Sequence, residues 1–167
     1  MSRISKAIGL GLVALFAISP TLSIAAEQYL DNRSTPQKLI ESFYNAINKQ
    51  QYARAYGYYS DNGSAPKNFQ DWADGYSKTK HVSVQFGPTE PNPGAGQIYW
   101  ALPVVLSVLA DNGDTTVFTG CYEIHMVNPG IITLPPHPPM GINDGHFKKT
   151  SKSISAAAAS LTLLNNC

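Results

Sequence analysis

Residues 97–128 decide the fold. They read QIYWALPVVLSVLA (97–110), DNGD (111–114) and TTVFTGCYEIHMVN (115–128). The two outer segments are rich in apolar, aromatic and β-branched side chains, which is typical of strands. Between them, Asn112-Gly113 is a strong turn signal, because both residue types tolerate the positive φ that tight hairpin turns require. The sequence therefore predicts a long antiparallel hairpin.

The register of this hairpin decides which side chains face the interior. If Asn112-Gly113 is a two-residue turn without a bulge, directly opposed residues share a face of the sheet. The opposed pairs would then be Leu106 with Thr119, Val104 with Cys121, Leu102 with Glu123, and Trp100 with His125. In this register Glu123 and His125 point inward, together with the large side chains of the first strand.

The second strand favours the other arrangement. Its apolar set, Tyr122, Ile124 and Met126, should also lie inside. A β-bulge at Gly120 would turn that set inward and leave Glu123 and His125 facing solvent or another subunit. The pattern alone leaves both registers open.

Helical segments precede the hairpin. Ser34 or Thr35 can cap a helix that has Pro36 at its first position. Its apolar stripe at helical spacing comprises Leu39, Ile40, Phe43, Tyr44 and Ile47. A second short helix is expected to carry Tyr52, Ala53, Ala55, Tyr56 and Tyr59, and a third, capped by Asn68, to carry Phe69, Trp72, Ala73 and Tyr76.

Two further strands are expected, over residues 81–86, which alternate apolar and polar side chains, and over residues 147–154. Helices followed by an antiparallel sheet predict an α+β fold in which the N-terminal helices pack on one face of a curved antiparallel sheet. The conformation of residues 155–167 stays open, as helix or tail.

This element order resembles the nuclear-transport-factor-two-like superfamily, the cone-shaped (half-barrel) fold shared with ketosteroid isomerases. Residues 35–48, TPQKLIESFYNAIN, look like its first helix, and residues 52–56, YARAY, look like its short second helix. The resemblance covers most of residues 35–155 and carries no catalytic signature. It implies one domain over residues 27–167, with a pocket between the sheet and the helices.

The N-terminus reads as a secretory signal peptide over residues 1–26. Arg3 and Lys6 precede an apolar run over residues 7–18, which is short for a membrane span, and Ser23-Ile24-Ala25 places small residues at a cleavage site. We therefore expect a periplasmic or secreted protein without a stable membrane anchor after cleavage.

Export changes how the two cysteines are interpreted. In an oxidising compartment, Cys121 and Cys167 are most simply a disulfide. The alternative, a reactive Cys121, would require a free thiolate with a base nearby.

Charge and composition exclude several functions. The chain has 12 Lys and Arg against 11 Asp and Glu, so no strong positive field attracts nucleic acid. Its four histidines lack metal-ligand spacing, so neither a metal nor a cofactor is expected.

The aromatic residues suggest a function. They make up 10% of the chain and are spread over helices and sheet with few charges beside them, which is typical of an apolar pocket for a small hydrophobic molecule. The candidate pocket residues are Tyr44, Tyr56, Trp72, Tyr76, Trp100 and His125.

Two other functions compete with this one. The first is an isomerase or dehydratase, in which the Glu123 carboxylate orients His125 as general acid or base. The second is a protein-interaction module, a homodimer through the outer face of the sheet around Tyr99, Val105 and Leu109.

Overall fold

The computed structural model describes residues 28–61 and 63–161. Its elements, in chain order, are α1 (Pro36–Asn48), α2 (Tyr52–Tyr56), α3 (Phe69–Asp74), β1 (Thr79–Phe86), β2 (Asn92–Gly94), β3 (Gln97–Ala110), β4 (Thr115–Val127), the 3-10 helix η1 (Pro129–Ile131), β5 (Gly141–Thr150) and α4 (Ile154–Ala159). The predicted α+β class is confirmed. The expected signal peptide and Cys167 lie outside the described residues, so export and the Cys121–Cys167 disulfide stay predictions.

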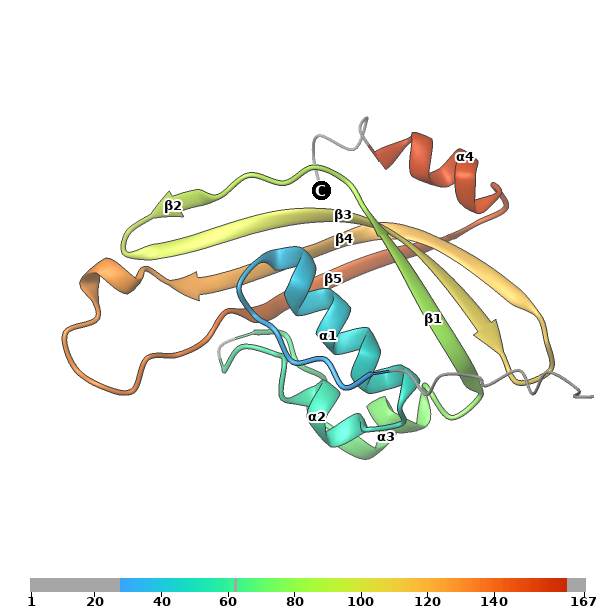
Figure 1. The fold of residues 1–167 in the computed structure, drawn as a ribbon, viewed down its shortest axis with the longest axis horizontal. Coiled ribbons are helices and arrows are strands. Elements are labelled where there is room, and N and C mark those ends of the chain that lie inside the picture. The colour runs from blue at the N-terminus through green and yellow to red at the C-terminus, as the bar shows by residue number, and fades with distance from the viewer. Residues whose placement is uncertain (1–27, 62, 162–167) are drawn as a thin grey trace, which may run out of the picture.

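The sheet is open and antiparallel, in the order β1-β3-β4-β5, and β2 pairs with the start of β3. Figure 1 shows that the sheet curves over α1, with α2 and α3 on the same side, whereas α4 lies across the opposite side. We call these two surfaces the α1 face and the α4 face. The predicted arrangement of N-terminal helices on one face of a curved sheet is confirmed.

The hairpin has a register that differs from both expected ones. The observed opposed pairs are Leu106 with Phe118, Val104 with Gly120, Leu102 with Tyr122, and Trp100 with Ile124. The pairing runs from Gln97–Val127 to Leu109–Thr115 without a shift, so the expected bulge at Gly120 is wrong as well.

The cause of this register is the length of the turn. The backbones of Ala110 and Asp114 are hydrogen bonded, so the loop has three residues, Asp111 to Gly113, and Gly113 has a φ of +89°. A three-residue loop that ends in a left-handed glycine is the next common hairpin connection after the two-residue turn. It moves the register by one residue and so places the apolar sets of both strands on the α1 face.

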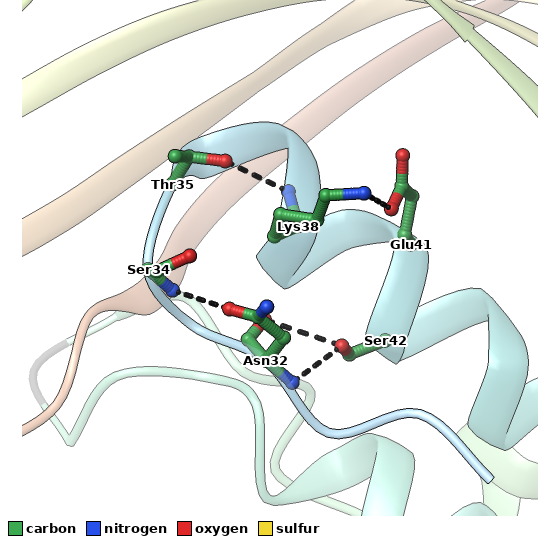
Figure 2. A network of polar contacts seen from close by, with 6 residues as sticks. All are labelled: Asn32, Ser34, Thr35, Lys38, Glu41 and Ser42. Carbon is green, nitrogen blue, oxygen red and sulfur yellow. Dashed lines mark hydrogen bonds and ion pairs between the residues drawn. The ribbon is translucent and has the colours of Figure 1, made fainter.

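The predicted start of α1 is confirmed, with Thr35 as the N-cap. Thr35 Oγ1 accepts a hydrogen bond from the Lys38 amide at 3.2 Å. Asn32, just before this helix, is bound by the fully buried Ser42 hydroxyl of α1, which accepts from the Asn32 amide at 2.8 Å and donates to the Asn32 carbonyl at 3.2 Å (Figure 2). These contacts fix the segment before α1 along that helix.

Each face of the sheet carries a packed cluster. On the α1 face, the predicted stripe of α1 packs against β1 and β3 and shares one core with β4 and β5, in which Phe43, Leu102 and Ile142 are fully buried. On the α4 face, Ala157 and Leu161 cover Val105. Among the helices of residues 28–61 and 63–161, none is long and apolar enough to span a membrane.

Candidate functional site

The site that the fold creates is a cavity of about 330 Å³ on the α1 face. Four tyrosines border it and give it the name used below, the tyrosine cavity: Tyr44 from α1, Tyr59 after α2, Tyr76 after α3, and Tyr122 from β4. The remaining lining residues are Ser64, Pro66, Thr79, Val82, Leu106, Val108, Phe118, Asp144, Gly145 and Phe147.

Tyr44 and Tyr122 meet across the interior. Their hydroxyl oxygens are 2.6 Å apart, and both side chains are about 95% buried, with 5% and 4% exposed. One hydroxyl donates to the other, which leaves the pair one further O–H proton and several acceptor lone pairs. The pair can therefore offer a donor or an acceptor to a molecule in the cavity.

Burial keeps these phenols neutral. It raises the pKa of Tyr44 and Tyr122 well above the usual tyrosine value. The nearby phenols of Tyr59 and Tyr76 add to the shift, whereas the hydrogen bond with Tyr122 opposes it at Tyr44. Burial also raises the pKa of Tyr59 and Tyr76. All four side chains are therefore uncharged hydrogen-bonding groups at any pH near neutrality, and none is a base.

A second layer of aromatic rings supports the cavity wall. Trp72 packs edge-on against Tyr76, with ring centroids 5.2 Å apart, and against Tyr59 at 6.2 Å. Its ring also contacts Tyr56 at 5.3 Å, and the Tyr56 hydroxyl donates to the Pro66 carbonyl. The wall around Tyr59, Pro66 and Tyr76 is thus held in place by residues that do not line the cavity.

Polar groups gather where exposed residues border the cavity. Ser64 is exposed, and its hydroxyl donates to Asp144 Oδ1 at 2.6 Å. The Gly145 amide donates to the same oxygen at 2.7 Å, and His146 Nε2 lies 3.1 Å from Asp144 Oδ2. The cavity therefore has an aromatic interior and one carboxylate at its edge.

The Ser64 hydroxyl is the main cause of a lowered pKa at Asp144. Partial burial opposes this shift, whereas the Gly145 amide and His146 add to it. Asp144 is consequently a carboxylate near neutral pH.

Sequence reasoning found part of this site. Of the predicted pocket residues, Tyr44 and Tyr76 line the cavity, Tyr56 and Trp72 form its second layer, and Trp100 is packed in the core with 9% of its surface exposed. The lining residues that it missed include the rings of Tyr59, Phe118, Tyr122 and Phe147 and the carboxylate of Asp144. The apolar alternation of β4 was the available signal for Tyr122.

The structure gives Glu123 and His125 separate partners. The register without a bulge was wrong, and so was the bulge at Gly120, but the facing that the bulge was expected to produce is observed. Tyr122 and Ile124 lie on the α1 face, and neither Glu123 nor His125 lines the tyrosine cavity. Glu123 is exposed and accepts a hydrogen bond from Asn143. His125 is hydrogen bonded to Gln97, and its ring lies 4.9 Å from that of Tyr99, tilted by 37°. Across residues 28–61 and 63–161, no ion pair joins Glu123 to His125. Their proposed catalytic roles stay a prediction.

His125 instead borders a smaller cavity of about 220 Å³, with Arg33, Ser60 and Asp61. Arg33 is already engaged there, because it donates to the Gly57 carbonyl at 2.7 Å and lies over the Tyr58 ring. In the described part of the chain, no cluster of three or more His, Cys, Asp or Glu side chains could hold a metal ion.

The outer surface suggested for dimerisation is partly occupied by the chain itself. Val105 is 1% exposed because Ala157 and Leu161 pack on it, whereas Tyr99 lies beyond this cluster and stacks with His125. A partner at this face would contact Tyr99 and α4 and could not reach Val105.

Comparison with known proteins finds solved structures of similar shape and low sequence identity. No family model matches the chain, and no curated protein matches it. Its overall shape is similar to that of a protein of unknown function from Mycobacterium tuberculosis. The two share 12% sequence identity over 77% of this chain and 80% of that chain, with a TM-score of 0.49.

Two other solved structures are similar to it. One is an NTF2-like protein of unknown function from Cytophaga hutchinsonii, with 13% identity over 72% of this chain and 95% of that chain and a TM-score of 0.38. The other is Bd1075 from Bdellovibrio bacteriovorus, with 16% identity over 70% of this chain and 40% of that chain and a TM-score of 0.43. The chain's own helix order and open curved sheet are those of the nuclear-transport-factor-two-like fold that its sequence resembles.

Proposed function

We propose that the domain binds a small, largely apolar molecule in the tyrosine cavity. The observation that carries this proposal is the cavity itself, about 330 Å³ of space bordered by Tyr44, Tyr59, Tyr76 and Tyr122. Pockets for small molecules begin at roughly 300 Å³ and are lined mainly by apolar and aromatic side chains with a few polar groups. The cavity meets this description at the small end of the range.

The chemistry of the lining favours binding over proton transfer. A general base that works near neutral pH needs a pKa raised toward 7, but the pKa of Asp144 is lowered. The tyrosines are neutral, so they can orient a ligand through hydrogen bonds and ring contacts without exchanging protons with it. Export to the periplasm or the medium is part of the same proposal and rests on the predicted signal peptide.

The test is a titration of the protein with tert-butylbenzene, a neutral aromatic probe, in which two-dimensional amide NMR detects the binding. We expect shifts at Gly145 and Phe147 in the native protein, and we expect Val108→Phe to weaken binding at least tenfold, because the added ring would fill the cavity that Val108 lines. Ser107→Phe is the matched control, since its side chain is next along β3 and points to the other face.

Two results would contradict the proposal. The first is an absence of amide shifts at the cavity up to the solubility limit of the probe. The second is equal loss of binding in Val108→Phe and Ser107→Phe, which would point to general loosening of the sheet and not to a site at Val108.

A further inference from the structure

The lining of the tyrosine cavity combines aromatic rings with one carboxylate. Six aromatic rings border it, those of Tyr44, Tyr59, Tyr76, Phe118, Tyr122 and Phe147. Asp144 is the charged member of the lining, and no Lys, Arg or His from residues 28–61 or 63–161 borders the same space. An anionic ligand would meet this carboxylate and no cation in the lining, because His146, which contacts Asp144 Oδ2 at 3.1 Å, does not line the cavity. The lining therefore disfavours acids.

We propose that the ligand is a small organic ammonium ion, with its charged nitrogen near Asp144 and its apolar groups among the tyrosines. This inference rests on the proposed function and narrows its ligand class. Aromatic rings attract cations through their quadrupole, and a quaternary or primary ammonium among several rings is the usual case. The carboxylate at the edge of the cavity adds a direct electrostatic attraction.

Asp144 retains the capacity to take such a partner. A carboxylate has about four acceptor positions on its two oxygens. Ser64 and the Gly145 amide both bind Oδ1, at 2.6 and 2.7 Å, whereas Oδ2 is contacted by His146 Nε2 at 3.1 Å. At least one acceptor position on Oδ2 is therefore open to an ammonium group.

The neighbouring contacts also hold this carboxylate in position. Ser64 is tied to β5 a second time, since its amide donates to the Asn143 carbonyl at 2.7 Å. Its hydroxyl oxygen, whose proton is donated to Asp144, also lies 3.0 Å from that carbonyl. The Asp144 side chain therefore does not have to be ordered by the ligand, which reduces the entropy lost on binding.

The tyrosine hydroxyls fit the same ligand class. The Tyr44–Tyr122 pair has lone pairs left after its 2.6 Å bond, and these can face a cation. The hydroxyl of Tyr76 has no hydrogen-bond partner in the described part of the chain, and burial keeps this phenol neutral. A compact ammonium ion would thus meet rings and oxygens on the inner side and a carboxylate at the edge.

The experiment compares two probes of the same shape, phenyltrimethylammonium and tert-butylbenzene, which differ in a charged nitrogen against a carbon. Affinities are measured by isothermal titration calorimetry at low ionic strength, where the attraction is least screened. We expect the cation to bind the native protein at least tenfold more tightly than the neutral probe. This comparison needs no variant and so does not depend on the folding of a mutant.

Variants then locate the charge. Asp144→Asn keeps a carbonyl oxygen that can accept hydrogen bonds from Ser64 and Gly145. It should lower the affinity for the cation at least fivefold and change the affinity for the neutral probe less than twofold. Glu90→Gln, which removes a carboxylate from the loop between β1 and β2, is the matched control and should leave both affinities unchanged.

The outcomes separate the two proposals. Equal affinity for the two probes, or an unchanged cation affinity in Asp144→Asn, would overturn the ammonium inference and leave the binding function standing. Binding of neither probe would overturn both. Weaker but detectable binding of the neutral probe, together with cation binding that falls in Asp144→Asn and not in Glu90→Gln, would support both.

Discussion

The two faces of one sheet have different interiors. On the α1 face, alternate residues of β3 such as Leu106 border a cavity of about 330 Å³, whose opposite wall includes tyrosines with polar tips. On the α4 face, Val105, which precedes Leu106 in β3, is covered directly by Ala157 and Leu161. Small aliphatic side chains thus let residues 157–161 pack closely on the α4 face, whereas the tyrosines of the α1 face surround a hollow.

The largest expected effect is a loss of stability when the core of the α1 face is changed. Phe43 is fully buried and packs edge-on against Tyr44 and Tyr59, at 5.0 and 6.0 Å between ring centroids. Phe43→Ala should lower the free energy of unfolding by about 3–5 kcal/mol, through lost burial and a new cavity. Urea denaturation measures this, and Leu161→Ala on the α4 face is the comparison, with a smaller expected loss of about 2 kcal/mol.

If Leu161→Ala cost as much as Phe43→Ala, the α4 face would be as much a part of the core as the α1 face. The distinction between the two faces would then be wrong.

The next effect concerns the α4 face and its predicted disulfide. Cys121 lies opposite Pro103 in β3 and His146 in β5, on the α4 face. Cys121→Ser and Cys167→Ser should each lower the stability of the oxidised protein by about 2–4 kcal/mol, because the bond closes a long loop of the unfolded chain.

Denaturation with and without a reductant is the measurement. The reductant should destabilise the native protein and leave either serine variant unchanged. A native protein that is insensitive to the reductant, or that has two titratable thiols, would contradict the disulfide.

A smaller effect is expected for the segment before α1. Ser42 is fully buried, and its hydroxyl binds both the amide and the carbonyl of Asn32. Ser42→Ala should cost about 1–3 kcal/mol, because both backbone groups lose a partner. Ser34→Ala is a suitable control, since Ser34 bonds through its backbone amide and not its hydroxyl. Equal stability of native protein and Ser42→Ala would show that this segment adds nothing to the α1 face.

The smallest effect is the pH dependence of Asp144. Its pKa is lowered in the folded protein, so it stabilises the fold above its ordinary pKa of about 3.9, and this contribution is lost as the pH falls through the folded value. The side chain is 37% exposed, so solvent screening limits the contribution to roughly a few tenths of a kcal/mol.

The free energies of unfolding of native protein and Asp144→Asn, measured from pH 7 down to pH 2, should differ slightly at neutral pH and converge in acid. A gap that widened in acid would reverse the assigned direction of the pKa.

The sequence predicted the elements better than the faces. The cap at Thr35, the stripe that includes Phe43, and the hairpin at Asn112-Gly113 follow from local rules, and the structure confirms all three. The facing of Tyr122 and Glu123 could not be predicted, because it depends on whether the turn has two or three residues, and one residue reverses every side chain of a strand.

Asp144 was missed for a related reason. It follows an irregularity in the pairing of β4 with β5, where Glu123 lies opposite Asp144 but Ile124 lies opposite Ile142. The extra residue, Asn143, re-aims the side chains beside it. No alternation in the sequence marks that position.

The most direct test of the central claim is a crystal structure of the protein grown with and without tert-butylbenzene. We expect a hollow between Tyr44, Tyr76 and Tyr122 in the free protein and electron density for the probe in the same place in the complex. The result that would contradict this prediction is a free protein in which these side chains fill the space, and crystals grown with the probe that show no density for it there.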